Sequence, residues 1–380
     1  MANKKTIYLI TIGGFLWAVG ASLFFRIMPL YVASLGGSSV YAGLIMAIST
    51  ITGLIALNLG AFLTHHIPLR LLITTGWFMS TIAALSYLSI HSINGVLIGA
   101  IFEGLAFIEM PPRVHVFSIV YPKDTHKALY IFIGGISAGF LIGPPIGGLI
   151  AQYIGYYAIF VLYSILATLA AIIIFFALPN IPPLKHQHKE KATYYTVISK
   201  LIWPLILTGA IALGSSMTNV IISLYLKETL GIKEALIGLL ASLSPLASMT
   251  LPLLSYMGLS PVSLFKLMAI GTSVSALSVL NPSTLTAAIY YFTHGWSESL
   301  YSGSQSIALP LLQEHEKPLG TGIISSMVNI GNATGVLLGG YLYTLSPQLP
   351  FIIAVIIGLL VMLFPKRLLV SPLHGKMQVP

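Results

Sequence analysis

Polar side chains recur on one face of an otherwise apolar stretch near residue 300. His294, Glu298, Tyr301 and Gln305 stand at positions i, i+4, i+7 and i+11, which is the spacing of a single helical face. An ionisable group in a membrane-crossing helix is costly and needs a partner or water, so it is a functional candidate by default. We expect Glu298 to exchange a proton, with His294 tuning it. The structural alternative is a hydrogen-bond network between helices.

Three further ionisable residues fall in one apolar run. Glu109 and Arg113 are four residues apart, in the order that favours an intrahelical ion pair, beside Pro111 and Pro112. Glu103 lies about 120° around the helix from Glu109, because six residues turn roughly 600°. The two carboxylates therefore do not share a face, and we do not expect a paired acid–base role. Both remain candidates for binding protons.

Hydrogen-bonding and aromatic residues elsewhere predict the walls of a cavity. Ser215, Ser216 and Thr218 are uncharged polar groups, although such residues in membrane helices often bond to their own backbone. Such walls suit a neutral or amphiphilic solute, or a modestly charged one facing Arg26 and the glutamates. Arg26 could equally be an anchor that reaches the membrane surface. The cavity candidates are Trp17, Arg26, Arg113, Asn219, Tyr301 and Gln305.

The composition is that of a protein that crosses a membrane many times. Of 380 residues, 56% are hydrophobic and 7% are charged, with a mean hydropathy of +0.93, whereas soluble domains average about 25% charged residues. The absence of cysteine excludes thiol catalysis and cysteine-ligated metals. No phosphate-binding G-x-x-x-x-G-K-[ST] loop and no H-E-x-x-H motif occurs. We expect no enzyme activity, no cofactor and no metal, with a site at His186 and His188 as the minor alternative.

Apolar runs of about 20 residues predict twelve membrane helices. Their ranges are 7–33, 40–63, 69–90, 94–118, 128–151, 156–178, 203–226, 235–257, 263–281, 284–312, 319–345 and 350–365.

Positive charge predicts the orientation of these helices. An even helix count puts both termini on one side, where we place 14 of the 18 Lys and Arg residues. The opposite loops hold only Lys227 and Lys233, and Arg26 and Arg113 lie inside helices. The asymmetry puts both termini in the cytoplasm and explains the net charge of +9 without a nucleic-acid partner. The first run is too long for a cleaved signal peptide, so we expect it to be retained.

A polar segment over residues 179–202 divides the chain into an N-terminal bundle (1–178) and a C-terminal bundle with a short tail (203–380). An internal repeat supports this division. The stretch from Gly139 to Gly148 recurs from Gly331 to Gly340 at an offset of 192 residues, with Val336 and Leu337 in place of two prolines.

Small residues in the first copy form one flat stripe, because Gly139, Gly143 and Gly147 are four residues apart. Such a stripe lets a neighbouring backbone approach closely, and Pro144 and Pro145 remove backbone donors and bend the helix locally. The full motif is Gly139, Gly143, Pro144, Pro145, Gly147 and Gly148, with Gly331, Gly335 and Gly339 in the second copy.

This motif resembles the G-x-x-x-G-P-x-x-G-G signature in the fifth helix of the major facilitator superfamily, where it is commonest among exporters and proton-coupled antiporters. The resemblance extends over nearly the whole chain. It implies that helices one, four, seven and ten line a central cavity, which would place the stripe of His294 and Glu298 inward. Departures also occur. Thr64 stands where the family has Asp, Ala100 where proton antiporters have Arg, and Glu103 where they have Gln.

We therefore expect an all-α membrane protein with twelve helices in two pseudo-symmetric bundles that works by alternating access. The predicted function is secondary transport of a small organic solute, most simply proton-coupled efflux from the cytoplasm. The alternative is a proton symporter or uniporter that takes up a sugar or another metabolite. The predicted partners are the solute, protons and the lipid bilayer of the cell membrane, with the protein as a monomer and without nucleic acid. An intramembrane enzyme or a sensor fits less well, because catalytic groups are scarce and no soluble domain is encoded.

Overall fold

A computed structural model describes residues 4–89, 91–121, 125–184 and 193–364, and these residues form helices joined by short turns. The chain divides into two compact units. The first contains Met1–His186 together with Val220–Pro245, and the second contains Gln187–Asn219 together with Leu246–Pro380.

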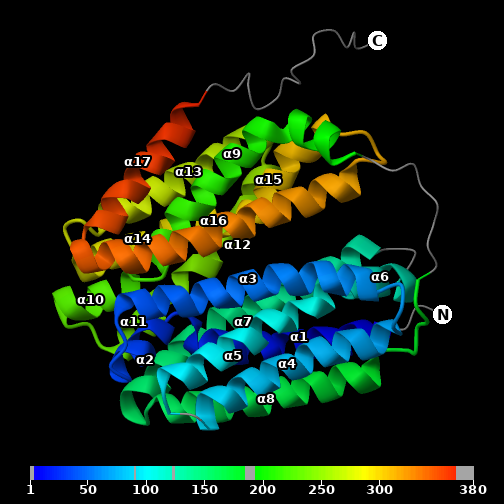
Figure 1. Cartoon of the computed structure of the whole chain (residues 1–380), viewed down its shortest axis with the longest axis horizontal. Coiled ribbons are helices and arrows are strands. Elements are labelled where there is room, and N and C mark those ends of the chain that lie inside the picture. The colour runs from blue at the N-terminus through cyan, green and yellow to red at the C-terminus, as the bar shows by residue number, and fades with distance from the viewer. Residues whose placement is uncertain (1–3, 90, 122–124, 185–192, 365–380) are drawn as a thin grey trace. The chain divides into compact units, whose positions relative to one another are not determined.

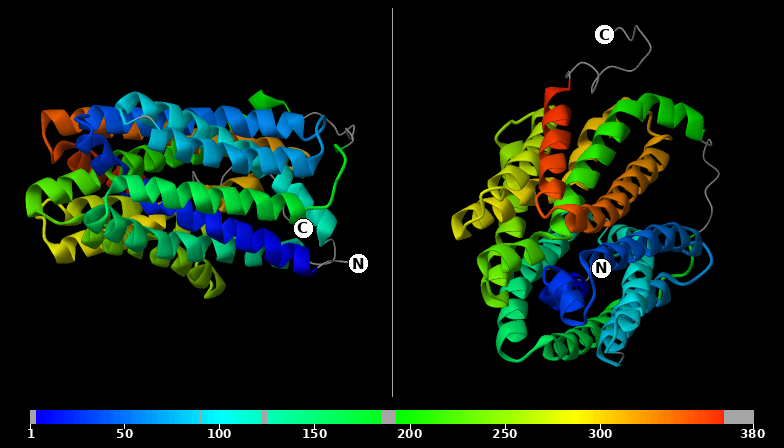
Figure 2. Two further views of the ribbon diagram at one scale, coloured as in Figure 1. Left: turned by 90° about the horizontal axis from the view of Figure 1, so that it is seen from below. Right: turned by 60° about the vertical axis from the view of Figure 1, so that its left-hand side comes forward.

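The first unit holds the helices of the N-terminal half. They are α1 (Lys4–Phe25), α2 (Met28–Ser34), α3 (Ser39–Leu63), α4 (Leu69–Ser89), α5 (Ile93–Leu105), the 3₁₀ turn η1 (Ala106–Glu109), α6 (Met110–Val120), α7 (Thr125–Tyr153) and α8 (Tyr156–Ala177). Within this unit α1 packs against α7 and α8, and α4 packs against α5 and α8 (Figures 1 and 2).

Two helices from beyond the midpoint of the sequence also belong to the first unit. They are α10 (Ile222–Leu230) and α11 (Glu234–Ala241). The α11 helix packs on α7, where a Cβ atom on Gly238 would collide with the carbonyl oxygen of Pro144. The Tyr156 hydroxyl and the Lys227 ammonium both bond to Glu234 at the start of α11. The segment 220–245 therefore groups with the first unit through its contacts, chiefly those of α11 with α7.

The second unit is also entirely helical in its described part. Its helices are α9 (Tyr194–Asn219), most of α12 (Leu243–Tyr256), α13 (Pro261–Ser278), α14 (Thr284–Glu298), α15 (Leu300–Ala308), the 3₁₀ turn η2 (Leu309–Leu311), α16 (Lys317–Leu345) and α17 (Leu349–Leu363). The α9 helix lies against α16 and α17, and α13 lies against α14 and α17 (Figure 1).

Each of the twelve predicted apolar runs is helical. In the described part of the chain, ten helical spans are long and apolar enough to cross a membrane. The last run forms the shorter apolar helix α17, and the run 284–312 forms α14, α15 and η2 with a break at Ser299. The α9 helix begins at Tyr194, nine residues before the expected start at 203, so its first turns occupy part of the expected linker.

The glycine stripe of α7 packs on α1 as the spacing predicts. A Cβ atom on Gly139 would lie 2.7 Å from Ala18 Cβ and 2.8 Å from the Phe15 carbonyl oxygen. A Cβ atom on Gly143 would lie 2.6 Å from the Val19 carbonyl oxygen. Only glycine allows the two backbones to come this close.

The second copy of the motif repeats this contact with its own partner helix. On α16, a Cβ atom on Gly331 would lie 2.7 Å from both Ala212 Cβ and the Gly209 carbonyl oxygen of α9. Phe15 and Ala18 precede Gly209 and Ala212 by 194 residues, so the partners are duplicated along with the glycines. The internal repeat predicted from the sequence is therefore present in the packing itself.

The loop after α3 is closed by a hydroxyl where the resembled signature has an acidic residue. Thr64 is 2% exposed, and its hydroxyl donates to the Gly60 carbonyl oxygen at 2.7 Å. The Leu184 N–H donates to the Thr64 carbonyl oxygen at 3.1 Å, and the Leu69 N–H donates to that of Ile181 at 3.0 Å. Backbone bonds to the chain after α8 hold this loop.

Candidate functional site

A break in the helical run 284–312 separates the predicted polar stripe into two parts. The α14 helix ends at Glu298 and α15 begins at Leu300, with Ser299 between them. The Ser297 hydroxyl donates to the His294 carbonyl oxygen at 2.7 Å, a local bond of the kind that competes with regular helix hydrogen bonds. His294 and Glu298 therefore lie before the break, whereas Tyr301 and Gln305 lie after it.

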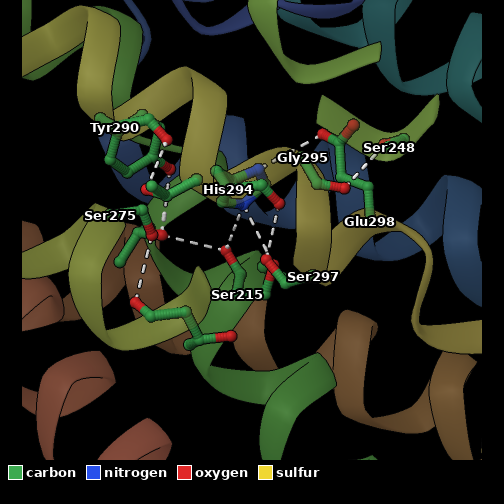
Figure 3. Close-up of polar contacts among 12 residues, drawn as sticks. Ser215, Ser248, Ser275, Tyr290, His294, Gly295, Ser297 and Glu298 are labelled. Atoms are coloured by element: carbon green, nitrogen blue, oxygen red, sulfur yellow. Dashed lines mark hydrogen bonds and ion pairs between the residues drawn. The ribbon is translucent and has the colours of Figure 1, made fainter. Parts of the chain in front are cut away.

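His294 is 1% exposed and is surrounded by partners within the second unit (Figure 3). Its Nε2 lies 3.0 Å from the Ser215 hydroxyl oxygen and 3.3 Å from the Ser215 carbonyl oxygen of α9. Its ring stacks on Tyr290 with centroids 5.3 Å apart. Its Nδ1 lies 3.3 Å from a carboxylate oxygen of Glu298. The two residues expected to act together are thus in contact.

The hydrogen bonds around Ser215 define where the imidazole carries hydrogen. The Ser215 hydroxyl donates to the Ser297 hydroxyl at 3.2 Å, so toward His294 it can only accept. A carbonyl oxygen also only accepts, and Nε2 must therefore carry a hydrogen atom. Nδ1 faces the Glu298 carboxylate, where two lone pairs would repel unless a proton lay between them. The Nδ1–carboxylate contact at 3.3 Å does not have the geometry of a hydrogen bond.

Glu103 lies in a separate hydrogen-bonded cluster inside the first unit. The Tyr163 hydroxyl of α8 donates to Glu103 Oε2 at 2.7 Å. The Trp17 indole N–H of α1 donates to the Ser80 hydroxyl of α4 at 3.0 Å, and Ser80 also interacts electrostatically with Tyr163. One candidate carboxylate and one candidate cavity residue, far apart in sequence, are thus joined.

Glu109 and Arg113 form the intrahelical pair that their spacing predicts. Arg113 donates to Glu109 Oε1 at 2.7 Å, and its guanidinium lies over the Phe132 ring at 4.6 Å. Glu109 is 8% exposed, and its Oε2 makes no hydrogen bond among the described residues. The 3₁₀ turn η1 ends at Glu109, and the two prolines open α6. Glu103 and Glu109 have different partners.

The remaining candidates are spread over several helices. Tyr301 interacts with Gln305 on α15, and Gln305 lines a pocket of about 500 Å³ together with Ser302, Ser306 and Lys317. Arg26 lies beyond the end of α1, with its guanidinium 5.6 Å from the Phe25 ring centre, and Asn219 is the last residue of α9. In the part of the chain that the structure describes, no three His, Asp or Glu side chains gather as metal ligands do. His186 and His188 lie outside the described residues.

Sequence reasoning missed the hydroxyl partners. Tyr163, Ser80 and Ser297 lie in runs that read only as apolar helices, and nothing in their spacing points to a carboxylate or an imidazole. Asn332 joins α16 to α9, because its side-chain oxygen accepts from the Ser216 hydroxyl at 2.7 Å. Asn329 instead donates to the Ser325 carbonyl oxygen of its own helix at 2.9 Å.

Comparison with known proteins agrees with this architecture. The sequence matches the Major Facilitator Superfamily over residues 10–212 and 204–378. It is 24% identical over 362 residues to an uncharacterized MFS-type transporter from Methanocaldococcus jannaschii, covering 89% of this chain and 91% of the relative. It is 23% identical over 381 residues to Multidrug resistance protein 2 from Bacillus subtilis, covering 94% of each.

A similar fold occurs among solved structures. That of the nucleoside transporter NupG superposes with a TM-score of 0.73 at 14% sequence identity, covering 94% of this chain and 98% of that one. With the family match over nearly the whole length and a set of apolar helices that can span a bilayer, the chain is a multi-pass membrane transporter of the Major Facilitator Superfamily.

Proposed function

We propose that this protein exports a small organic solute in exchange for protons, and that His294 and Glu298 bind the exchanged proton. The observation that carries the proposal is the contact at 3.3 Å between His294 Nδ1 and the Glu298 carboxylate. Because Nε2 already carries hydrogen, this contact is favourable only while a further proton is present.

His294 and Glu298 differ in how far their side chains are buried. The His294 side chain is 1% exposed, whereas 27% of the Glu298 side chain is exposed. A proton can therefore reach the carboxylate from water while the imidazole remains fixed by Ser215 and Tyr290. Glu298 is the exchanging group in this arrangement, and His294 is the group that holds it.

Loss of the proton has a mechanical consequence. A neutral Nδ1 and an ionised carboxylate repel each other at this distance, so the Glu298 side chain must turn away. Glu298 is the last residue of α14, directly before the break at Ser299. A change in the charge of the pair therefore affects the junction between α14 and α15. The regular helix is already interrupted there.

Export is supported by the motif and by one relative. The stretch Gly139–Gly148 resembles a signature that is commonest among exporters and antiporters, and a protein with 23% identity is named for multidrug resistance. Thr64 and Ala100 depart from the exporter pattern. The proposal therefore rests on the contact between His294 and Glu298 rather than on the resemblance to exporters.

The test is solute flux in proteoliposomes with an imposed pH gradient, measured with a panel of labelled solutes. We expect the wild-type protein to move at least one solute against the direction of proton flow. Glu298→Gln should lose the part of the flux that depends on the gradient. Glu314→Gln is the matched control, because the Glu314 side chain is 89% exposed and lies outside the apolar helices.

Two outcomes would contradict the proposal. One is a Glu298→Gln variant whose gradient-driven flux and pH profile equal those of the wild type. The other is solute movement in the same direction as protons, which would indicate the uptake symporter instead.

A further inference from the structure

We propose that Glu103 is a second proton-binding carboxylate, located in the first unit, and that Trp17, Ser80 and Tyr163 position it as a polarised chain of hydrogen bonds. The inference deepens the proposed function and rests on it for its role in transport. The geometry of the chain and its test are independent of that role.

The direction of the chain follows from the donor inventory. An indole N–H can only donate, so Trp17 fixes Ser80 as the acceptor in their contact at 3.0 Å. The single Ser80 hydrogen is then free for the Tyr163 oxygen. Tyr163 in turn gives its hydrogen to Glu103 Oε2 at 2.7 Å. In the proposed chain, the hydrogens of Trp17, Ser80 and Tyr163 are therefore directed toward the carboxylate.

The chain joins four helices, because its members come from α1, α4, α8 and α5 in that order. Ser80 and Tyr163 are each 0% exposed, so water does not compete for their bonds. Glu103 itself is partly exposed. This arrangement suits a proton site, because the residue is partly exposed and a fixed donor holds one oxygen of the carboxylate.

Among the described residues, no other charged side chain is found in contact with Glu103. The phenols of Tyr163 and Tyr87 interact with it from α8 and α4. The neighbouring helix α3 has no carboxylate or base, and its only titratable residue, Tyr41, lies in its first turn. Glu109 in η1 is already paired with Arg113. Besides burial, the hydrogen bond from Tyr163 is the local influence on the charge of Glu103.

The polarity of the chain has a consequence for both charge states. Donors directed at a carboxylate favour its ionised form. When the carboxylate takes a proton, its Oε2 keeps a lone pair with which it can still accept from Tyr163. Trp17 also contacts Trp77 and Phe140, with ring centroids 5.8 and 6.2 Å away. A solute that displaced Trp17 would therefore remove the first donor of the chain.

The test reads the carboxyl group directly. Infrared difference spectra are recorded on the full-length protein in lipid nanodiscs while the pH is stepped from acidic to basic, with neither solute nor gradient. The carbonyl stretch that is present in the wild type and absent in Glu103→Gln reports the protonated form of Glu103. Its intensity against pH gives the titration midpoint in each variant.

The expected shifts decrease along the chain. Tyr163→Phe removes the direct donor and should move the midpoint upward by about one to two pH units, the value of a hydrogen bond to a charged group. Ser80→Ala and then Trp17→Phe should give progressively smaller upward shifts. A purely structural role for these residues would not produce that order.

The matched control is Trp296→Phe. The Trp296 indole N–H donates to the Thr250 hydroxyl at 3.1 Å, and the Thr250 hydroxyl donates to the Ala247 carbonyl oxygen, so this indole chain ends on backbone. Its loss should leave the Glu103 midpoint unchanged.

The proposal is overturned if no carboxyl band is lost in Glu103→Gln, or if Tyr163→Phe, Ser80→Ala and Trp17→Phe all titrate like the wild type. A protein that shows no gradient-driven flux but has the graded shifts would contradict the proposed function alone. A protein with gradient-driven flux but no shifts would contradict this inference alone.

Discussion

Lys200 on α9 places its ammonium nitrogen 2.7 and 2.8 Å from the two carboxylate oxygens of Glu316, the residue before α16. The Gln313 N–H also donates to Glu316 Oε2 at 2.9 Å. Glu316 is 4% exposed, and the pair joins the first turns of α9 to the start of α16. Burial alone would raise the pKa of Glu316, but these bonds hold the pKa below its usual range.

The Lys200–Glu316 pair should make stability depend on pH. A carboxyl group with a lowered pKa in the folded state stabilises the protein above the pKa of the unfolded chain, about 4.3, and this contribution is lost as the pH falls through the folded pKa. Glu316→Gln should therefore lower the free energy of unfolding at neutral pH, by roughly 1.5–3 kcal/mol for lost charge-assisted bonds.

Thermal unfolding of the purified protein at a series of pH values measures this effect. The difference between the wild type and Glu316→Gln should shrink as the pH falls below about 4. Glu314→Gln is the control and should leave the curve unchanged, because Glu314 is solvated. A difference that is equally large at pH 3 and pH 7 would show that the carboxylate charge is not the cause.

Substitution in the glycine stripe should destabilise each unit in the same way. Gly143→Ala on α7 places a methyl group against Val19, and Gly335→Ala on α16 places one 3.0 Å from Leu213 Cα. Each should cost about 1–3 kcal/mol, the usual penalty of overpacking.

Two glycines on the same helices provide controls for this prediction. Gly134 on α7 and Gly322 on α16 have no atoms within 4 Å of a Cβ position. Alanine there should be neutral or stabilising by about 0.5–1 kcal/mol, because it removes conformational freedom from the unfolded chain. Thermal stability in detergent distinguishes the two sets, and equal effects in both would refute the packing argument.

Ser215→Ala should change the pH profile of transport. The substitution removes the hydroxyl that accepts from His294 Nε2 and so loosens the ring that faces Glu298. We expect the pH at half-maximal flux to shift by about one unit. The control is Ser216→Ala, at the position next to Ser215. It removes a hydrogen bond to Asn332 and should leave the pH profile of transport unchanged. Similar profiles for Ser215→Ala and the wild type would show that the hydroxyl does not tune the pair.

Removing one partner of the buried Glu109–Arg113 ion pair should lower the free energy of unfolding more than removing both partners. Arg113→Gln leaves the Glu109 carboxylate buried without a counter-charge, which is worth about 3–5 kcal/mol. The double variant with Glu109→Gln should regain a large part of that loss. A double-mutant cycle in unfolding free energy measures the coupling, and additive single and double effects would be inconsistent with the contact at 2.7 Å.

Much of the fold could be predicted because a bilayer imposes strong rules. Apolar runs of fixed length located all twelve helical regions, and the spacing of Gly139 and Gly143 predicted the face that packs on a neighbouring backbone. The i, i+4 spacing of Glu109 and Arg113 predicted their ion pair. These rules are local, because each uses only residues that are close together in the sequence.

The parts that sequence could not supply depend on contacts between distant residues. A constant helical period predicted one face from His294 to Gln305, but the bond from Ser297 to the backbone and the break at Ser299 interrupt that period. The partnership of Ser80 with Trp17, 63 residues away, leaves no periodic trace in either helix. The inclusion of α10 and α11 in the first unit is equally invisible, because their hydropathy only marks them as membrane segments.

The duplicated glycine contacts set an order of assembly during synthesis. The joint between α1 and α7 can form once residue 153 has left the ribosome, because both helices are by then complete. The face of α7 that carries Gly148 has to wait for Glu234 and the rest of α11, some eighty residues later. Until then the newly made N-terminal half lacks the segment that packs on Gly148, so a small-residue surface of α7 stays uncovered by its native partner.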